Sequence, residues 1–131
     1  MTDSRVAGTL FAATLALVAA QFALAGDGAF STIRSRAGDP YTAHMVLGLV
    51  IAAMTLIDLI AVLASRPARS RPATLWPAVA LAVLTVAVEP LLAEAGRQAA
   101  AVGALHALNG VVILALTGWL VGATTRRRVR V

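Results

Sequence analysis

The chain alternates long apolar runs with short polar connections that carry most of its arginines. Each of four runs is long enough to cross about 30 Å of hydrocarbon as a helix, which takes roughly 20 residues. The four runs cover residues 6–25, 40–64, 75–95 and 99–121, and a basic tail follows at 124–131. Because the connections are short, we expect an all-α, integral membrane, up-down-up-down four-helix bundle, with residues 1–131 in a single domain.

Helix boundaries are marked by familiar signals. Asp39 followed by Pro40 predicts the start of the second helix, and Thr74 predicts an N-cap for the third. Gly96 and Gly122 predict the ends of the third and fourth helices. The sequence therefore predicts both where the helices begin and where they stop.

The first run has one alternative interpretation, a cleaved signal peptide. Ala23-Leu24-Ala25 fits a small-x-small cleavage rule. The apolar stretch of 20 residues is longer than the ~7–15 of a signal core, and Gln21 interrupts it. A retained membrane helix is the favoured interpretation.

Composition narrows the class of protein and of site. Hydrophobic residues make up 60% of the chain, charged residues only 13%, and the mean hydropathy is +0.85, as in an integral membrane protein. The chain contains no cysteine. Disulfides, thiolate zinc sites, iron–sulfur ligation and covalent haem attachment are therefore excluded.

The net charge of +5 and the pI near 11.6 have two interpretations, nucleic-acid binding or membrane topology. The arginines lie in the connections and the tail, which favours topology and no nucleic-acid partner. Eight lie on one side: Arg5, Arg66, Arg69, Arg71, Arg126, Arg127, Arg128 and Arg130. Three lie on the other: Arg34, Arg36 and Arg97. This asymmetry predicts that both termini are cytoplasmic and that the arginine-rich tail contacts anionic lipid.

The type of membrane is inferred from the amino-acid composition. Alanine, valine and arginine are abundant and lysine is absent, which is typical of a GC-rich bacterial genome. We therefore expect a multi-pass protein of the bacterial cytoplasmic (inner) membrane. Trp76 and Trp119 at the cytoplasmic ends of two helices, and Tyr41 at an outer end, fit interfacial anchors.

Strongly polar residues recur at one depth of the predicted bundle. His44 and His106 lie within about two turns of the outer ends of the second and fourth helices. Gln21 and Glu89 lie in the last turns of the first and third helices, which run the opposite way. Ionisable groups inside lipid are costly, so a layer of this kind predicts a functional site.

Each histidine is followed four residues later by glycine, at Gly48 and Gly110. At this spacing the histidine and the glycine share a helix face, and the missing side chain makes room for a flat macrocycle. The alternative is that the glycines only allow close helix packing. A weak internal repeat aligns His44–Met54 with the segment that begins at His106.

The chemistry of two neutral imidazoles favours noncovalent haem b, with His44 and His106 as axial ligands of the iron. Copper or zinc is an alternative, with Glu89, Glu94 and Gln21 as further ligands. A second alternative is a structural network in which the histidines donate hydrogen bonds to Glu89 or Gln21.

Several neighbouring residues have supporting roles in these interpretations. Pro90 removes a backbone donor and predicts a kink beside Glu89, whose carboxylate then orients a histidine or holds a proton. Asn109 is expected to form an interhelical hydrogen bond. Asp58 is expected to meet Arg66, whose long side chain snorkels back toward it.

Three segments together resemble a known family. They are Gln21-Phe-Ala-Leu-Ala-Gly26, His44-x-x-x-Gly48 and Leu105-His106-x-x-Asn109-Gly110. The pattern resembles a family of small, uncharacterised bacterial four-helix membrane proteins over nearly the full length. It also distantly resembles one four-helix half of haem A synthase, whose halves each carry a histidine pair on the second and fourth helices. The resemblance implies that His44 and His106 are haem ligands.

The chain departs from haem A synthase in ways that bear on activity. The synthase has a glutamate three residues before the second-helix histidine, where this chain has Tyr41. The cysteine pair of many synthases is absent, and there is one four-helix unit rather than two, although a homodimer restores eight helices. Synthase activity is therefore not expected.

These observations predict haem b binding for electron transfer or haem handling, with no catalytic residues. A redox-partner membrane protein or a quinone is the expected partner. The main alternative is a noncatalytic accessory subunit whose polar layer only sets helix packing. A third class, a proton-coupled transporter using Glu89 and His106, is also compatible with the sequence.

Overall fold

The chain forms four long apolar helices. The computed structural model describes residues 3–33 and 41–125, with side chains for 6–30 and 41–125, and every regular element in these ranges is helical. Four segments are long and apolar enough to cross a membrane: Val6–Phe30, Thr42–Ala64, Pro72–Gly96 and Ala100–Thr125. The chain is therefore a helical protein with the character of a multi-pass membrane protein.

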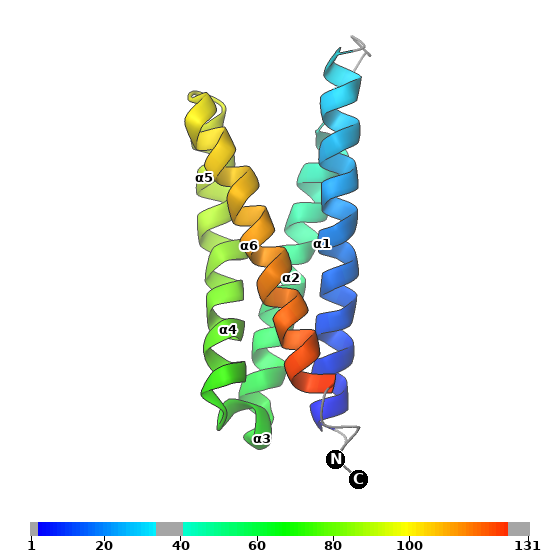
Figure 1. Ribbon diagram of the computed structural model, residues 1–131, viewed down its shortest axis with the longest axis vertical. Coiled ribbons are helices and arrows are strands. Elements are labelled where there is room, and N and C mark those ends of the chain that lie inside the picture. The colour runs from blue at the N-terminus through cyan, green and yellow to red at the C-terminus, as the bar shows by residue number, and fades with distance from the viewer. Residues whose placement is uncertain (1–2, 34–40, 126–131) are drawn as a thin grey trace.

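The helices run alternately along one axis. In chain order the elements are α1 (Asp3–Ile33), α2 (Thr42–Ala64), α3 (Arg66–Arg69), α4 (Pro72–Val83), η1 (Leu84–Val88), α5 (Glu89–Gly96) and α6 (Ala100–Thr125). Figure 1 shows α1 rising, α2 descending to the short α3, the α4–η1–α5 span rising, and α6 descending. We call the end near α3 the lower end and the opposite end the upper end.

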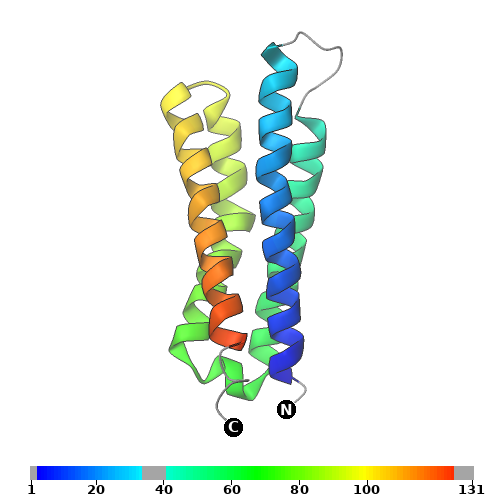
Figure 2. The ribbon, with the colours of Figure 1, turned by 45° about the vertical axis from the view of Figure 1, so that its right-hand side comes forward.

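Helix packing is closest toward the lower end. α1 packs against α2 and α6, and α4 packs against α2 and α6, so α1 and α4 lie diagonally across the bundle. Figures 1 and 2 show that α1 and α2 diverge from α5 and α6 toward the upper end. The largest fully buried side chains, Phe11, Leu81 and Leu120, belong to helices that meet in the lower part. The apolar core thus holds the lower part together and leaves two helix pairs at the upper end.

The first helix is longer than its sequence predicts. We expected it to end near residue 25, but α1 continues through Gly26, Asp27 and Gly28 to Ile33. A glycine in a helix costs only about 1 kcal/mol relative to alanine, and the continuing helix satisfies its own backbone hydrogen bonds. Two glycines are therefore insufficient to stop α1.

Other helix ends also differ from the expected ones. α2 begins at Thr42, while Asp39 and Pro40 lie outside the described residues. α4 begins at Pro72, so Thr74 is a buried residue of its first turn rather than its N-cap. α6 runs past Gly122 to Thr125, and the arginines of the tail lie outside the described residues.

The expected irregularity before Pro90 takes the form of a π-helical turn. Pro90 lacks an N–H, and in an α-helix its ring would clash with the carbonyl of Val86. Residues 84–88 instead adopt the wider π turn, in which the N–H of Glu89 donates to the carbonyl of Leu84. The turn is fixed across the bundle because Thr85 Oγ1 lies 2.7 Å from Thr55 Oγ1 of α2.

Candidate functional site

The structure brings the polar residues of the upper half of the bundle into one layer. The centroids of the His44 and His106 rings are 6.2 Å apart, and the ring planes are inclined by 72°. His44 lies on α2 and His106 on α6, so the rings meet between the two diverging helix pairs. Both side chains are partly buried. The layer is therefore an interhelical contact inside the bundle.

His44 is held by Gln21 of α1. Its Nδ1 lies 3.2 Å from the backbone oxygen of Gln21, and the Gln21 amide Nε2 donates to the backbone oxygen of His44 at 2.9 Å. The same amide nitrogen lies 3.3 Å from His44 Nε2. An oxygen at Nδ1 and a donor at Nε2 are both satisfied when the proton is on Nδ1. The lone pair of His44 is then on Nε2.

His106 has a matching arrangement with Glu89. Asn109 Nδ2 donates to Glu89 Oε2 at 2.5 Å, and Glu89 Oε1 lies 3.4 Å from His106 Nδ1. The second contact is long for a hydrogen bond, yet His106 Nδ1 is buried and has no closer partner. Glu89 is the first residue after the π turn, which sets its direction toward α6.

Both rings therefore face an oxygen through Nδ1, which leaves Nε2 as the nitrogen able to bind a metal. Metal-binding histidines are usually oriented in this way, with the other ring nitrogen donating to a carbonyl or carboxylate. Two imidazoles on one metal, with bonds of about 2 Å each, have ring centroids on the order of 6 Å apart. The observed 6.2 Å lies in that range.

The space beside the two glycines is filled by α1. A Cβ added to Gly48 would lie 3.2 Å from Gln21 Nε2, and one added to Gly110 would lie 3.4 Å from Phe22 Cζ. Both neighbours are ends of side chains rather than backbone, and Phe22 is 41% exposed. Two imidazoles are a donor set that suits haem, and room for a flat macrocycle beside the glycines would require Gln21 and Phe22 to turn away.

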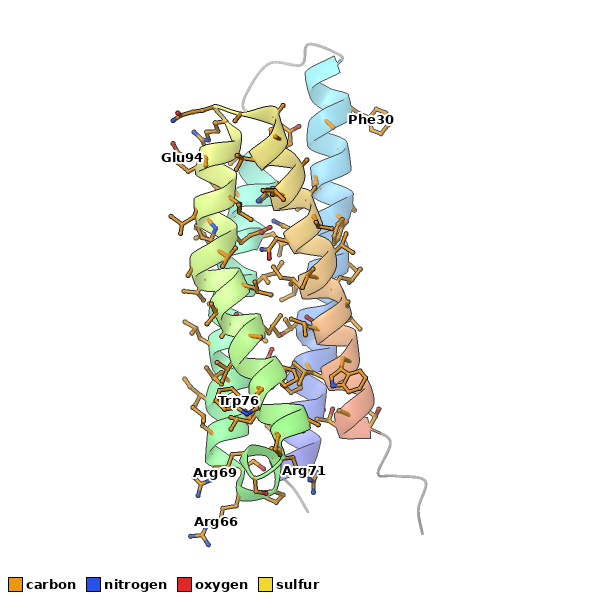
Figure 3. The ribbon with its side chains drawn as sticks, turned by 60° about the vertical axis from the view of Figure 1, so that its left-hand side comes forward. Phe30, Arg66, Arg69, Arg71, Trp76 and Glu94 are labelled. Carbon is orange, nitrogen blue, oxygen red and sulfur yellow. The ribbon has the colours of Figure 1, made fainter. Side chains whose placement is uncertain are left out.

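A metal site with several protein ligands is not formed. Among residues 6–30 and 41–125, no three His, Cys, Asp or Glu side chains come together in a way that would hold a metal ion. Glu94 instead forms an exposed ion pair with Arg97 at 3.5 Å and points outward at the upper end (Figure 3). The alternative of a zinc or copper site completed by Glu94 has no geometric basis.

The expected pair of Asp58 and Arg66 is wrong. Thr14 Oγ1 of α1 donates to Asp58 Oδ2 at 2.8 Å, deep in the bundle. Arg66 is exposed and extends away from the helices at the lower end (Figure 3). A short hydroxyl on the neighbouring helix reaches Asp58 without the loss of side-chain freedom that an arginine would incur.

Sequence reasoning missed three contacts. Phe22 covers Gly110, and its position next to Gln21 in the sequence was the available signal. Tyr41 was assigned only as an interfacial anchor, but its ring lies edge-on to His44 with centroids 6.3 Å apart. Thr14 was one of several threonines in apolar segments, and no sequence signal distinguished it from the others.

Comparison with known proteins gives no relative: the chain matches no family model, no curated protein and no solved structure. A function for this chain must therefore be inferred from the geometry of its own side chains.

Proposed function

We propose that the protein binds one haem b noncovalently between His44 and His106 and serves in electron transfer or haem handling. The observation that carries the proposal is the close pair of imidazoles, each with Nδ1 toward an oxygen and with ring centroids 6.2 Å apart. Apolar helices surround the layer, as a haem pocket in a helical bundle requires.

The residues of the layer have distinct tasks in this proposal. The backbone oxygen of Gln21 and the carboxylate of Glu89 hold the two rings in the orientation that presents Nε2. Asn109 fixes Glu89, and Gly48 and Gly110 leave room beside the ligands. When bound, haem would supply a one-electron redox centre near the upper end.

The proposed orientation follows from arginine placement. The short connection around α3 carries Arg66, Arg69 and Arg71, whereas the described upper connection carries Arg97. Both termini then lie in the cytoplasm of a bacterium, the chain crosses the inner membrane up, down, up and down, and the histidine layer lies near the periplasmic face. In this proposal the arginine-rich tail binds anionic lipid. The partner at the histidine layer is a redox-partner protein, a quinone or a second copy of the chain.

Absorption spectroscopy tests haem binding directly. Protein purified from a haem-sufficient host, or reconstituted with haem, is expected to show the spectrum of six-coordinate low-spin haem with two imidazole ligands. His44→Ala and His106→Ala are each expected to abolish that spectrum. Met45→Ala is the matched control, because Met45 adjoins His44 but is 52% exposed on the outer face of the bundle.

A second function, a purely structural polar layer, is favoured by one observation. His44 Nε2 already has a partner in the Gln21 amide, and Asn109 and Glu89 are joined across α5 and α6. In that case the protein stays colourless after haem reconstitution, while His44→Ala lowers its thermal stability. Colourless wild-type protein that is folded by circular dichroism therefore rejects the haem proposal.

A further inference from the structure

Asp58 of α2 is buried without a full set of partners. Asp58 is 1% exposed, and Thr14 Oγ1 donates a hydrogen bond to its Oδ2 at 2.8 Å. The other carboxyl oxygen, Oδ1, is buried and has no hydrogen-bond partner in the part of the chain that the structure describes. Neither the histidine layer nor its proposed function uses this group, since 14 residues of α2 separate Asp58 from His44, about 21 Å of helix.

The depth of Asp58 makes a charged carboxylate costly. Asp58 lies six residues before Ala64, the last residue of α2, which is about 9 Å from the helix end. Arg66 is exposed and extends away from the bundle (Figure 3), and the exposed Arg69 donates from Nη1 to the backbone oxygen of Leu63 at 3.3 Å. Among the described side chains, Asp58 has one hydroxyl donor and no ion pair. A carboxylate with so few partners is poorly compensated inside a membrane, whereas the protonated acid is tolerated.

Buried Val62 lies one turn below Asp58 on α2, and buried polar groups lie farther below and directly above. Ser65 directly follows the end of α2 and is 2% exposed, and its Oγ has no hydrogen-bond partner among the described residues. Above, Thr55 and Thr85 hydrogen-bond to each other, and buried Ile51 separates them from the histidine layer. Unsatisfied buried groups of this kind are the places where internal water enters.

We propose that Asp58 is a proton-binding site inside the membrane, in which the carboxyl group carries a proton and accepts a hydrogen bond from Thr14. The site is separate from the histidine layer and does not depend on haem.

Infrared spectroscopy of ligand-free protein in lipid tests this proposal. At neutral pH we expect the carbonyl stretch of a protonated carboxyl group, shifted by 13C labelling of aspartate and lost in Asp58→Asn. Thr14→Val removes the hydroxyl that contacts Asp58 and is expected to raise the frequency of the band. Thr117→Val is the matched control, since Thr117 is also fully buried but donates to the carbonyl of Ile113 in its own helix.

A second measurement keeps the proposal testable if Asp58→Asn does not fold. An apolar carbodiimide, which modifies protonated carboxyl groups in lipid, is expected to label Asp58 several-fold faster than the exposed Asp27, as seen by mass spectrometry of the wild-type chain. The proposal is overturned if the wild type shows no aspartate band, if Thr117→Val shifts the band as much as Thr14→Val, or if Asp27 is labelled faster.

Discussion

At the level of single side chains, the amide of Gln21 determines what His44 can do. The amide nitrogen lies 3.3 Å from the ring nitrogen that would bind a metal and also donates to the backbone of the same residue. Its own oxygen Oε1 is buried and unpartnered. Gln21 therefore stabilises the ligand-free layer and competes with any metal for His44.

Replacement of Gln21 by alanine is expected to strengthen haem binding. A hydrogen bond of about 1 kcal/mol no longer competes with the iron, which corresponds to roughly a fivefold increase in affinity. Equilibrium titration of the ligand-free protein with haem measures the change. Gln98→Ala, at an exposed glutamine of the connection between α5 and α6, is expected to leave the affinity unchanged. A lower affinity in Gln21→Ala would show that the amide supports the bound state instead.

At the level of the elements, the π turn of residues 84–88 decides where Glu89 points. A π turn contains about one residue more than an α turn, and one residue corresponds to about 100° around a helix axis. Without the turn, the Glu89 side chain would rotate away from His106 and Asn109 of α6. The site thus depends on an irregularity of the helix as well as on its residues.

The sequence predicted the existence of this irregularity but not its form. Pro90 requires that one backbone bond is lost, and a kink or a wider turn satisfies that requirement equally well. The observed π turn is accompanied by a contact of Thr85 with Thr55, which forms only when α2 and η1 pack together. The polar residues of the layer were predictable from depth and helix period, whereas Phe22, Thr14 and the end of α1 depend on contacts that periodicity does not encode.

The turn between α5 and α6 depends on two glycines. A Cβ added to Gly96 would lie 3.0 Å from the Cα of Gly103, which is backbone and does not yield easily. Gly96→Ala is therefore expected to destabilise the protein by about 1–3 kcal/mol. Gly118→Ala is the control, because nothing lies within 4 Å of its added Cβ. Unfolding in detergent measures both, and equal stabilities would show that the helices separate at no cost.

At the scale of the whole molecule, the two ends of the bundle differ in charge and in closeness of packing. The lower end holds the α3 connection with its arginines, and the upper end holds the diverging pairs and the histidine layer. The difference in charge between the two ends could be predicted from the positions of the arginines in the sequence. The divergence of the helix pairs could not be predicted, because it results from how the four helix surfaces pack together and each surface alone is similarly apolar.

The orientation of the bundle can be tested with single cysteines, because the chain has none of its own. Ser70 lies between α3 and α4, Gln98 lies between α5 and α6, and both are exposed. In intact bacteria, a membrane-impermeant maleimide is expected to label Gln98→Cys, and to label Ser70→Cys only after the membrane is permeabilised. The opposite pattern would place the histidine layer on the cytoplasmic side.

The divergence of the helix pairs also links the layer to the surrounding lipid. The 6.2 Å between the rings depends on the angle between the two helix pairs as well as on the contact of Phe22 with Gly110. Helices adjust their tilt when the hydrocarbon thickness changes, at a cost of fractions of a kcal/mol per Å. Longer or shorter acyl chains will thus move the two imidazoles together or apart, so that the distance between the rings changes with the thickness of the bilayer.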